Sequence, residues 1–536
     1  MKVTTEPVQD TPKDLKARAR ALICELESPE FKGSFVRCLY EEAALASYNG
    51  TDKPSWLQEF QEDFFNKITE EQNPDGSWSN HKKSEFVPDK VVTTLAVLNS
   101  LDNQTSKLNH ARSSAWRFLN DTVPRILQVS AHKKTFAFEA ILAKKLSTAI
   151  TTSKSAPSQE VLYATSLLKK ETERIFKKKI SKLYRKNSTI HSLLDALPSP
   201  QKIDWERVQP FQEDNGSMGI YPSSTLEFLT HTKGKTRPRL SAFRYVQEVL
   251  QKNDNHLVQF YPSENFERYW SYYALVSSPL GDLLKDNQNF RIPSPTKGLS
   301  VSKYFSLPDV DTSAMKDYVA LRAGAQTELE FIDHFYADGT LYCYEDENRV
   351  SPSANIHVLM AMIELDRRTN GRYLSLQRHK QQFHTVLEYL SEIIKKYGFI
   401  EDKWHISDLY PVSHGLELFS KLSNLHSIES KYTSLIATSM SKLQSWLLDK
   451  RKPQGWGVHT EPTIEETSYA IMGLLQTKDG SKKLGQTFIG NIRQFLLMAP
   501  IESDPPLWIG KTTYKSNSIP EALRLSALAL IHKHNS

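Results

Sequence analysis

A short turn that contains glycine recurs between apolar segments, and this repeat constrains the fold more than any other feature of the sequence. The two clearest copies are Gln72–Trp78 (QNPDGSW) and Gln212–Gly219 (QEDNGSMG), and weaker copies begin at Tyr397 and Pro453. Glycine supplies the turn after one helix, glutamine can bond the exposed backbone there, and tryptophan can cover the seam to the next helix. We therefore predict that these turns join stacked helices and belong to the scaffold.

Apolar residues at spacings of three and four recur along the whole chain, whereas strand-like alternation is scarce. Clear examples are the segments 91–101, 243–250, 356–365, 466–475 and 522–531. Each segment carries one apolar stripe, which is typical of a helix that packs on one face. With only 20 glycines in 536 residues, the chain is predicted to be all-α, and its length suggests about three domains or two large ones.

Composition excludes several classes of protein. The 68 basic and 62 acidic residues leave a net charge of +6, which is too small an excess to favour a nucleic-acid partner. The densest basic run, 169–186, has apolar residues at helical spacing and is interpreted as a solvated helix face.

The three cysteines, Cys24, Cys38 and Cys343, are scattered and form no CxxC pair. Neither a secretory signal nor a transmembrane segment is recognisable. A cytoplasmic location is expected.

Several further segments follow one another in an order that a known family shares. They are Asp204–Glu206, 215–225, Phe266–Trp270, Pro308–Met315, 342–351, 354–359 and Leu507–Lys511. Together with the turns, they resemble the class II terpene cyclases of the copalyl diphosphate synthase and squalene-hopene cyclase superfamily. The resemblance implies two α/α-barrel domains, the βγ terpene cyclase architecture, without a class I α domain.

The resemblance also implies a division of the chain. Residues 1–49 would form N-terminal helices that join the β domain, 50–290 the γ domain, and 291–536 the β domain with the catalytic motif. The active site would lie in a cavity between the two barrels, because pockets are common at domain interfaces.

The family's catalytic signature is Asp-x-Asp-Asp-Thr-Ala-Met, and here the matching residues 309–315 read Asp-Val-Asp-Thr-Ser-Ala-Met. By this match, Asp311 is the general acid, Asp309 is its supporting partner, and Thr312 replaces the third aspartate. The chemistry agrees, since protonating an isolated alkene needs a carboxylic acid that stays protonated in a dry pocket. Two carboxyls at the start of a helix can keep one of them protonated and favour the anion afterwards. Taken alone, the motif is better explained as an ordinary helix N-cap, with Ser313 in the first helical turn.

Other residues receive roles in the same way. The carbocation formed after protonation needs aromatic faces, and we select Trp270, Tyr304 and Trp404 from the family-like segments. His357 and Asn355 could act with water as the final base, with a structural histidine as the alternative interpretation.

The diphosphate of the substrate requires cations at the mouth of the pocket. By resemblance, Lys252 and Lys511 would contact it. Mg2+ would be the cofactor, and Asp204 and Glu206 are its predicted ligands because the acidic pair that precedes them in plant members is missing here. A solvated surface charge remains the alternative for each of these residues.

The predicted reaction is the protonation-initiated cyclisation of geranylgeranyl diphosphate to a bicyclic, labdane- or clerodane-type diphosphate. No Asp-Asp dipeptide occurs in the sequence, so the class I metal motif that ionises diphosphates is absent and the product should keep its diphosphate. A downstream class I synthase or phosphatase would then act on the product. The alternatives are conversion of farnesyl diphosphate to drimenyl diphosphate, which the Asp-x-Asp-Thr-Ser variant suggests, and an inactive α/α-barrel scaffold or binding protein.

Overall fold

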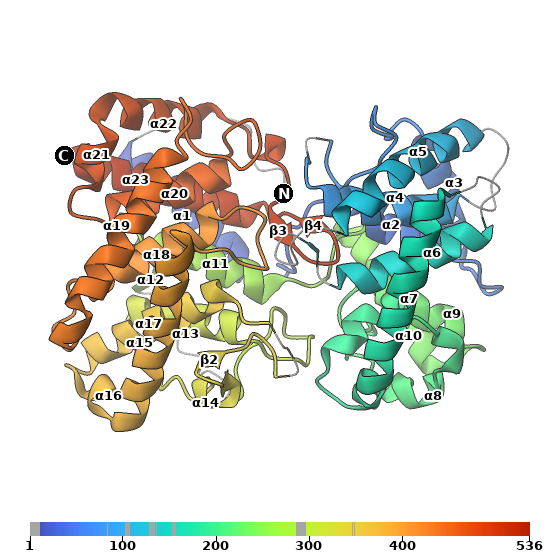
Figure 1. The fold of residues 1–536 in the computed structure, drawn as a ribbon, viewed down its shortest axis with the longest axis horizontal. Coiled ribbons are helices and arrows are strands. Elements are labelled where there is room, and N and C mark those ends of the chain that lie inside the picture. The colour runs from blue at the N-terminus through green and yellow to red at the C-terminus, as the bar shows by residue number, and fades with distance from the viewer. Residues whose placement is uncertain are drawn as a thin grey trace.

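Two lobes of helices lie side by side in a computed structural model that describes residues 11–82, 84–101, 108–127, 134–135, 137–152, 157–285, 296–345, 347 and 349–535 (Figure 1). The prediction of an all-α chain is confirmed, because the only strands among these residues are two antiparallel pairs of two-residue strands. The strands are β1 (Tyr336–Ala337), β2 (Thr340–Leu341), β3 (Trp508–Ile509) and β4 (Thr513–Tyr514).

The first lobe contains nine helices of the described chain. They are α2 (Leu39–Ala46), α3 (Ser55–Lys67), α4 (Val87–Ser100), α5 (Asn109–Ile126), α6 (Phe138–Thr152), α7 (Gln159–Lys179), α8 (Trp205–Val208), α9 (Pro222–His231) and α10 (Arg237–Lys252). A 3-10 helix, η4 (Thr189–Ala196), packs against α6 and α9.

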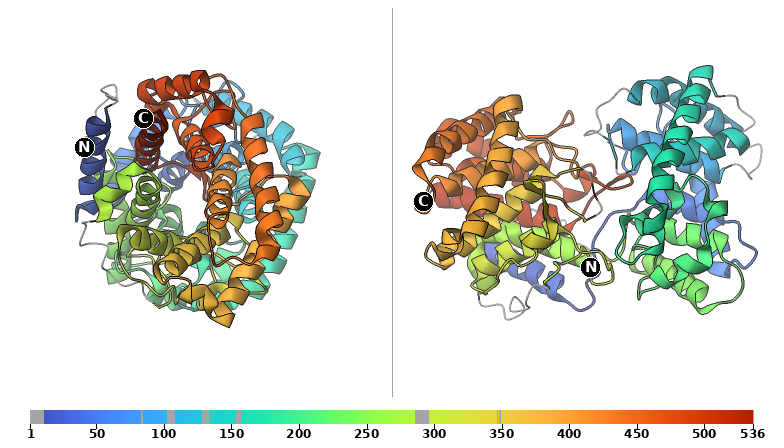
Figure 2. Two further views of the ribbon diagram at one scale, coloured as in Figure 1. Left: turned by 90° about the vertical axis from the view of Figure 1, so that its left-hand side faces the viewer. Right: turned by 60° about the horizontal axis from the view of Figure 1, so that its bottom comes forward.

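The second lobe is formed by the N-terminal helix together with the C-terminal half of the chain, and its helices form a ring when viewed end-on (Figure 2). They are α1 (Pro12–Glu27), α11 (Glu264–Val276), α12 (Asp282–Lys285), α13 (Val310–Ala323), α14 (Ile332–Phe335), α15 (Pro352–Arg368), α16 (Arg372–Ser375), α17 (Gln377–Tyr397), α18 (Leu409–Leu422), α19 (Thr433–Asp449), α20 (Ile464–Leu475), α21 (Gly480–Leu484), α22 (Gln486–Met498) and α23 (Ser518–Asn535).

Helix packing divides the chain differently from the predicted boundaries. Helix α1 packs against α11 and α23, where Arg18 and Glu521 form an ion pair of 2.7 Å, whereas α2 packs against α4 and α9 in the first lobe. Helix α11 precedes the predicted boundary at 290 but packs against α13 and α23, because most of its side chains are apolar and buried in the second lobe. The boundary at 290 itself lies outside the described residues.

The recurrent turns clasp neighbouring helices as predicted. Trp78 donates its indole NH to the carbonyl of Ile68 at 2.9 Å, and its backbone NH bonds the Thr94 hydroxyl at 2.8 Å. Trp456 repeats both contacts, with Leu447 at 2.7 Å and Thr467 at 3.0 Å.

Glycine is required in the two clearest turns. Gly76 and Gly216 have φ angles of +87° and +92°, and an added Cβ would lie 2.3 Å from a backbone oxygen of α5 and 2.4 Å from one of α10, respectively. Beside each glycine, a glutamine amide bonds the glycine carbonyl, at 2.8 Å from Gln72 and 2.6 Å from Gln212.

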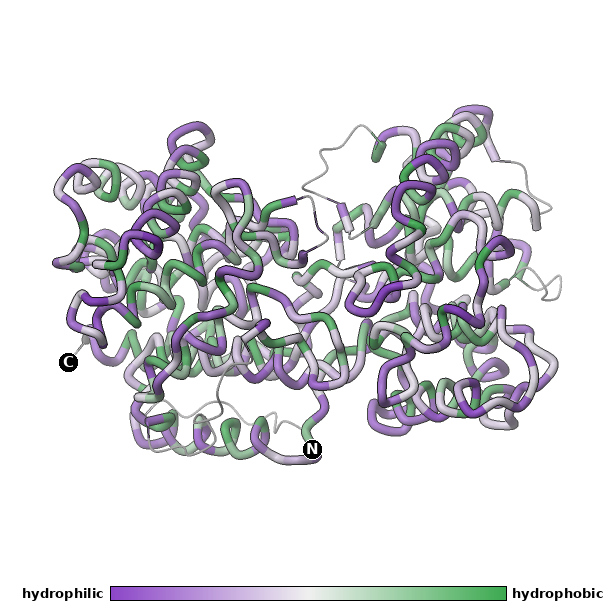
Figure 3. Tube along the Cα trace, turned by 90° about the horizontal axis from the view of Figure 1, so that it is seen from below, coloured by the Kyte–Doolittle hydropathy of each residue, from purple (hydrophilic) through white to green (hydrophobic). Residues whose placement is uncertain are grey.

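Apolar and polar stretches alternate along the helices (Figure 3), and the apolar faces meet in two main cores. One core lies within α2 to α7, and the other fills the second lobe and continues into α9 and α10. The core of the second lobe thus includes residues of α9 and α10 in the first lobe, and this packing joins the two lobes. Among the described residues, no helix has the length and apolar character needed to cross a bilayer.

Candidate active site

A cavity lies where the two lobes meet, which is a common place for a ligand pocket. Its lining residues are Thr189, Ser192, Ile220, Tyr221, Phe260, Phe266, Trp270, Val301, Phe305, Asp309, Asp311, Thr312, Cys343, Tyr344, Trp404, Trp508, Ile509, Gly510 and Tyr514. Helices α11 and α13 and the β3–β4 hairpin supply the second lobe's wall, and η4 supplies part of the first lobe's wall.

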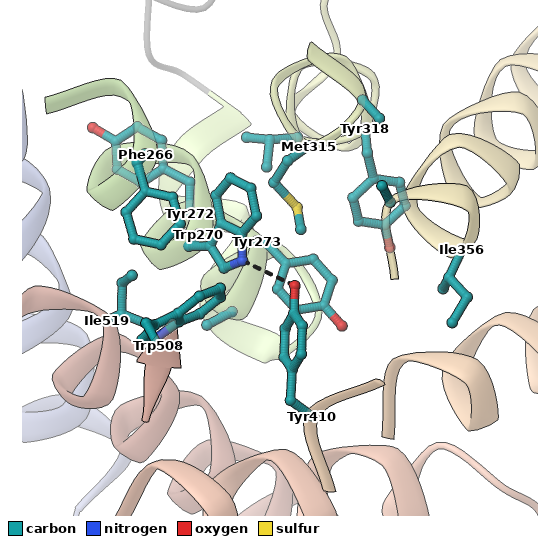
Figure 4. Packing of buried hydrophobic residues seen from close by; sticks show 14 of the residues in the cluster. Phe266, Trp270, Tyr272, Tyr273, Met315, Tyr318, Ile356, Tyr410, Trp508 and Ile519 are labelled. Carbon is teal, nitrogen blue, oxygen red and sulfur yellow. Dashed lines mark hydrogen bonds between the residues drawn. The ribbon is translucent and has the colours of Figure 1, made fainter. Parts of the chain in front are cut away.

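Aromatic rings make up nine of the nineteen lining residues. Trp270 packs against Phe266 and Trp508 with ring centroids 4.6 and 5.9 Å apart. Its indole NH points at the hydroxyl of Tyr410 at 3.4 Å, which holds the ring in place (Figure 4). Among the described residues, the lining contains no lysine or arginine, and Asp309 and Asp311 are its only carboxyl groups. Such a wall can stabilise a cation without offering it a strong nucleophile.

Asp309 caps the start of α13, and it is buried. One of its carboxyl oxygens accepts the backbone NH of Thr312 at 2.6 Å, and the other has no hydrogen-bond partner among the described residues. Burial raises the pKa of Asp309 to about 8, and the nearby Asp311 adds to this rise, although the bond from Thr312 opposes it. The carboxyl is therefore mostly protonated at neutral pH. The N-cap interpretation is thus confirmed for Asp309, and it does not remove the residue from the cavity.

Asp311 lies two residues further, in the first turn of α13, and it faces the cavity. Its carboxyl contacts Nδ1 of His357 from α15, and Nε2 of His357 lies 2.6 Å from Nδ1 of His414 on α18. The three side chains meet because α15 packs against both α13 and α18. His357 can therefore hold the Asp311 carboxyl in one orientation and stabilise its anion when the proton has left.

His357 and Asn355, which were predicted to act together with water as the final base, have other partners in the structure. His357 contacts Asp311, the predicted acid, so its position suits a partner of Asp311 better than a separate base. Asn355 bonds the backbone of Leu341 through both ends of its amide, at 3.0 and 2.9 Å, and also the carbonyl of Ser351 at 2.9 Å. These bonds tie α15 to β2, so Asn355 has a structural role here.

Two of the three selected aromatic residues line the cavity. Trp270 and Trp404 do so, and Trp404 donates its indole NH to the sulfur of Cys343 at 3.1 Å, so this copy of the turn does not form the usual clasp. Tyr304 is half-buried outside the lining, where its ring adjoins Lys32 and Lys303, and the next residue, Phe305, faces the cavity instead.

The two predicted diphosphate lysines are not at the cavity wall. The ammonium of Lys511 is fully buried and bonds Asp195 at 2.6 Å, Ser223 at 2.8 Å and Ser224 at 3.1 Å. It lies behind the ring of Tyr221, which does face the cavity. Lys252 ends α10 with its side chain 51% exposed, and it does not line the cavity.

The predicted magnesium ligands do not form a site. Asp204 caps α8 by accepting the backbone NH of Arg207 at 3.3 Å, and both Asp204 and Glu206 are exposed on the first lobe. No group of three or more histidine, cysteine, aspartate or glutamate side chains suited to a metal occurs among the described residues. The residues present therefore do not fit a magnesium ion held by the protein alone.

Comparison with known proteins reveals several relatives over most of the chain, although no family model matches it. A type B diterpene cyclase of Mycobacterium tuberculosis is 25% identical over 492 residues, which cover 88% of this chain and 91% of that protein. A bifunctional premutilin synthase of Rhodocybe pseudopiperita is 27% identical and covers 96% of this chain, but the chain spans only 55% of that protein.

Among solved structures, ent-copalyl diphosphate synthase from Streptomyces platensis has the same fold, with a TM-score of 0.73, 21% identity and coverage of 97% of this chain and 99% of that one. The relatives and the fold agree with the landmarks in the sequence. The chain is thus a relative of the class II diterpene cyclases and copalyl diphosphate synthases, and it has their all-α architecture.

Proposed function

We propose that this protein is a class II terpene cyclase that protonates geranylgeranyl diphosphate and releases a bicyclic diphosphate of the labdane or clerodane type. The observation that carries the proposal is the placement of Asp311, which faces an aromatic cavity on one side and contacts His357 on the other. The similarity to a type B diterpene cyclase supports a C20 substrate.

The first step is proton transfer from the Asp311 carboxyl to the terminal alkene of the substrate. The proton forms a C–H bond, the alkene electron pair leaves a tertiary cation, and the carboxylate remains paired with His357. Asp309 supports the step by staying uncharged, because a second anion beside Asp311 would hold the proton back.

The cation then cyclises against the aromatic wall that includes Trp270, Phe266 and Trp508. Loss of a proton ends the reaction and leaves the diphosphate in place. Because the described lining offers no lysine or arginine, we place the diphosphate at the mouth of the cavity. A retained diphosphate makes the product a substrate for a class I synthase or a phosphatase.

One observation favours a second substrate. Thr312 gives the motif the form Asp-x-Asp-Thr-Ser, which resembles the signature of drimane-forming cyclases. Farnesyl diphosphate, cyclised to drimenyl diphosphate by the same acid, is therefore the alternative.

The test is an incubation of the purified protein with farnesyl, geranylgeranyl and geranylfarnesyl diphosphates, followed by dephosphorylation and mass spectrometry of the alcohols. A bicyclic C20 alcohol supports the proposal, and a C15 drimane alcohol supports the alternative. The same incubation with EDTA tests the need for Mg2+. If no substrate is converted, the inactive scaffold becomes the leading alternative.

A further inference from the structure

The densest basic run of the chain lies on the surface of the first lobe. The 18 residues 169–186 contain nine lysines and arginines and two glutamates, a net charge of +7, whereas the whole chain carries +6. The run occupies the end of α7 and the 3-10 helix η3 (Ile180–Tyr184), and eight of its nine basic residues are exposed (Figure 1). The predicted solvated helix face is thus confirmed, but solvation alone does not explain why the charge is concentrated there.

The outer face of α7 combines apolar and basic side chains. Its residues, spaced by four, three, four and four positions, are Tyr163, Leu167, Lys170, Arg174 and Lys178. The two apolar residues come first, and they are 68% and 51% exposed. Arg174 forms an ion pair of 2.5 Å with Glu171, whereas Lys170 and Lys178 form none among the described residues. The face therefore presents an apolar end and a basic end to solvent.

The second half of α7 has little packing of its own. The helix contacts α5 and α6, but only four of its 21 residues are buried, and the last of them is Thr172. Most of the stability of a helix in a protein comes from packing, so a long end without a buried residue is unusual. Lysines in the last turn suit the helix dipole, but they account for that turn only. The outer face of α7 thus has the features of a surface that binds a partner.

The side chains of this face indicate the chemistry of the partner. A nucleic acid or an acidic protein would pair with the cations but would leave the neighbouring apolar side chains without a role. A bilayer that contains anionic lipids offers both phosphates and, next to them, an apolar layer. We propose that the outer face of α7 docks this protein on such a bilayer, with Tyr163 and Leu167 at the level of the headgroups and Lys170, Lys177 and Lys178 against the lipid phosphates.

This inference goes beyond the proposed function and does not depend on it. Docking needs only the surface of α7, whereas the chemistry needs the cavity between the lobes. The two are connected if the proposed function holds, because a prenyl diphosphate is an amphiphile whose apolar chain partitions into bilayers. A docked enzyme would then be held next to the bilayer that contains its substrate.

The experiment measures docking directly, without substrate. The purified full chain is sedimented with vesicles of phosphatidylcholine alone or of phosphatidylcholine and phosphatidylglycerol in equal amounts. The protein should bind the anionic vesicles at least about 10-fold more tightly than the neutral ones, because several cations face the surface. Raising the salt from about 0.1 M to about 1 M should weaken this binding, since the screening length falls from about 10 Å to about 3 Å.

Two variants separate the basic end of the face from its apolar end. The triple variant Lys170→Gln/Lys177→Gln/Lys178→Gln should bind anionic vesicles about 100-fold more weakly, because each cation near such a surface contributes about fivefold. The double variant Tyr163→Ser/Leu167→Ser should bind about 10-fold more weakly, and most of the binding that survives high salt should be lost with it. Thermal unfolding verifies that both proteins are folded, which is expected because these side chains are exposed.

The matched control, Lys395→Gln/Lys396→Gln/Lys450→Gln, removes the same charge from exposed lysines of the second lobe and should bind as the wild type does. Equal losses in the two triple variants would overturn the proposal, because net charge and not the outer face of α7 would then decide binding. Failure of the wild type to bind anionic vesicles would overturn it as well and would favour a polyanion in water as the partner. The proposed function fails separately, since turnover of substrate dispersed in water should be the same in the wild type and in the α7 variants.

Discussion

Two buried polar clusters lie near the cavity, and they differ in how their charges are balanced. The acid cluster consists of Asp309, Asp311, His357 and His414 in the second lobe. The lysine cluster consists of Lys511 from the second lobe and of Glu41, Asp195, Ser223 and Ser224 from the first lobe. Both clusters are almost completely buried, yet only the lysine cluster contains a permanent cation.

The pKa values of the aspartates show what the cation does. Burial opposes a charge on Asp195, but the charges of Lys511 and Lys145 and the hydrogen bonds prevail and lower its pKa to about 2. Asp309 has no such cation, so burial raises its pKa to about 8. A carboxylate that is paired with a cation stays ionised. A buried carboxyl without a cation stays protonated, so it can donate its proton or remain uncharged beside a neighbouring acid that donates its own. We therefore expect the lysine cluster to hold the lobes together and the acid cluster to take part in the proposed chemistry.

Removing the acid should have the largest effect. Asp311→Asn should lower turnover by about 10²-fold to 10⁴-fold, because the amide has no proton of sufficient acidity to give to an alkene. The free energy of unfolding should change little, since the amide keeps the shape of the carboxyl. Turnover is measured by mass spectrometry of the dephosphorylated product, and unfolding by urea titration. Turnover close to that of the wild type would remove Asp311 from the chemistry.

Removing the cation from the lysine cluster should affect stability instead. Lys511→Met should lower the free energy of unfolding by about 3 to 5 kcal/mol, because it leaves the Asp195 carboxylate buried without its ion-pair partner. The double variant Lys511→Met/Asp195→Asn is the control, and it should recover part of the loss. Urea titrations of the three proteins give the comparison. A loss below about 1 kcal/mol would show that the ion pair does not hold the lobes together.

The sequence predicts the parts of the molecule that depend on local pattern. Three-and-four spacing predicts the helices, and the turns around Gly76 and Gly216 are recognisable because only glycine fits their backbone. The Asp-x-Asp motif predicts Asp309 and Asp311 at the cavity, since both lie in one helical turn whose direction the cap sets.

The partners of the buried polar residues depend on which distant segments of the chain come together. The local sequence pattern does not contain this information. Lys511 resembles a ligand lysine in sequence, but its partner Asp195 is 316 residues away and neutralises it. His414 was overlooked, although its spacing to Glu417 and Lys421 places polar groups on one face of an apolar helix. A buried polar stripe of that kind is a signal that sequence analysis could have used.

Asp309→Asn tests the raised pKa of Asp309 through the pH dependence of the free energy of unfolding. The pKa of Asp309 rises from its ordinary 3.8 to about 8 in the folded protein, so between these values the folded state holds a proton that the unfolded state has released. The wild type should therefore lose stability as pH rises through this window, by at most about 1.4 kcal/mol per pH unit, and the variant should lose less. Urea titrations across the window measure the difference. Parallel curves for the two proteins would contradict the raised pKa.

Glu41→Gln applies the same test to the lysine cluster, where a smaller effect is expected. Burial raises the pKa of Glu41 from 4.5 to about 7, against the opposing charge of Lys511, so its window is narrower than that of Asp309. The amide oxygen can still accept from the backbone NH and hydroxyl of Ser223, so the variant should be slightly more stable than the wild type near neutral pH, with unchanged turnover. Because burial raises the pKa of both Glu41 and Asp309, turnover decides between the two carboxyls. If Glu41→Gln lost activity as Asp311→Asn does, the presence of a cation would no longer distinguish a supporting cluster from a reactive one.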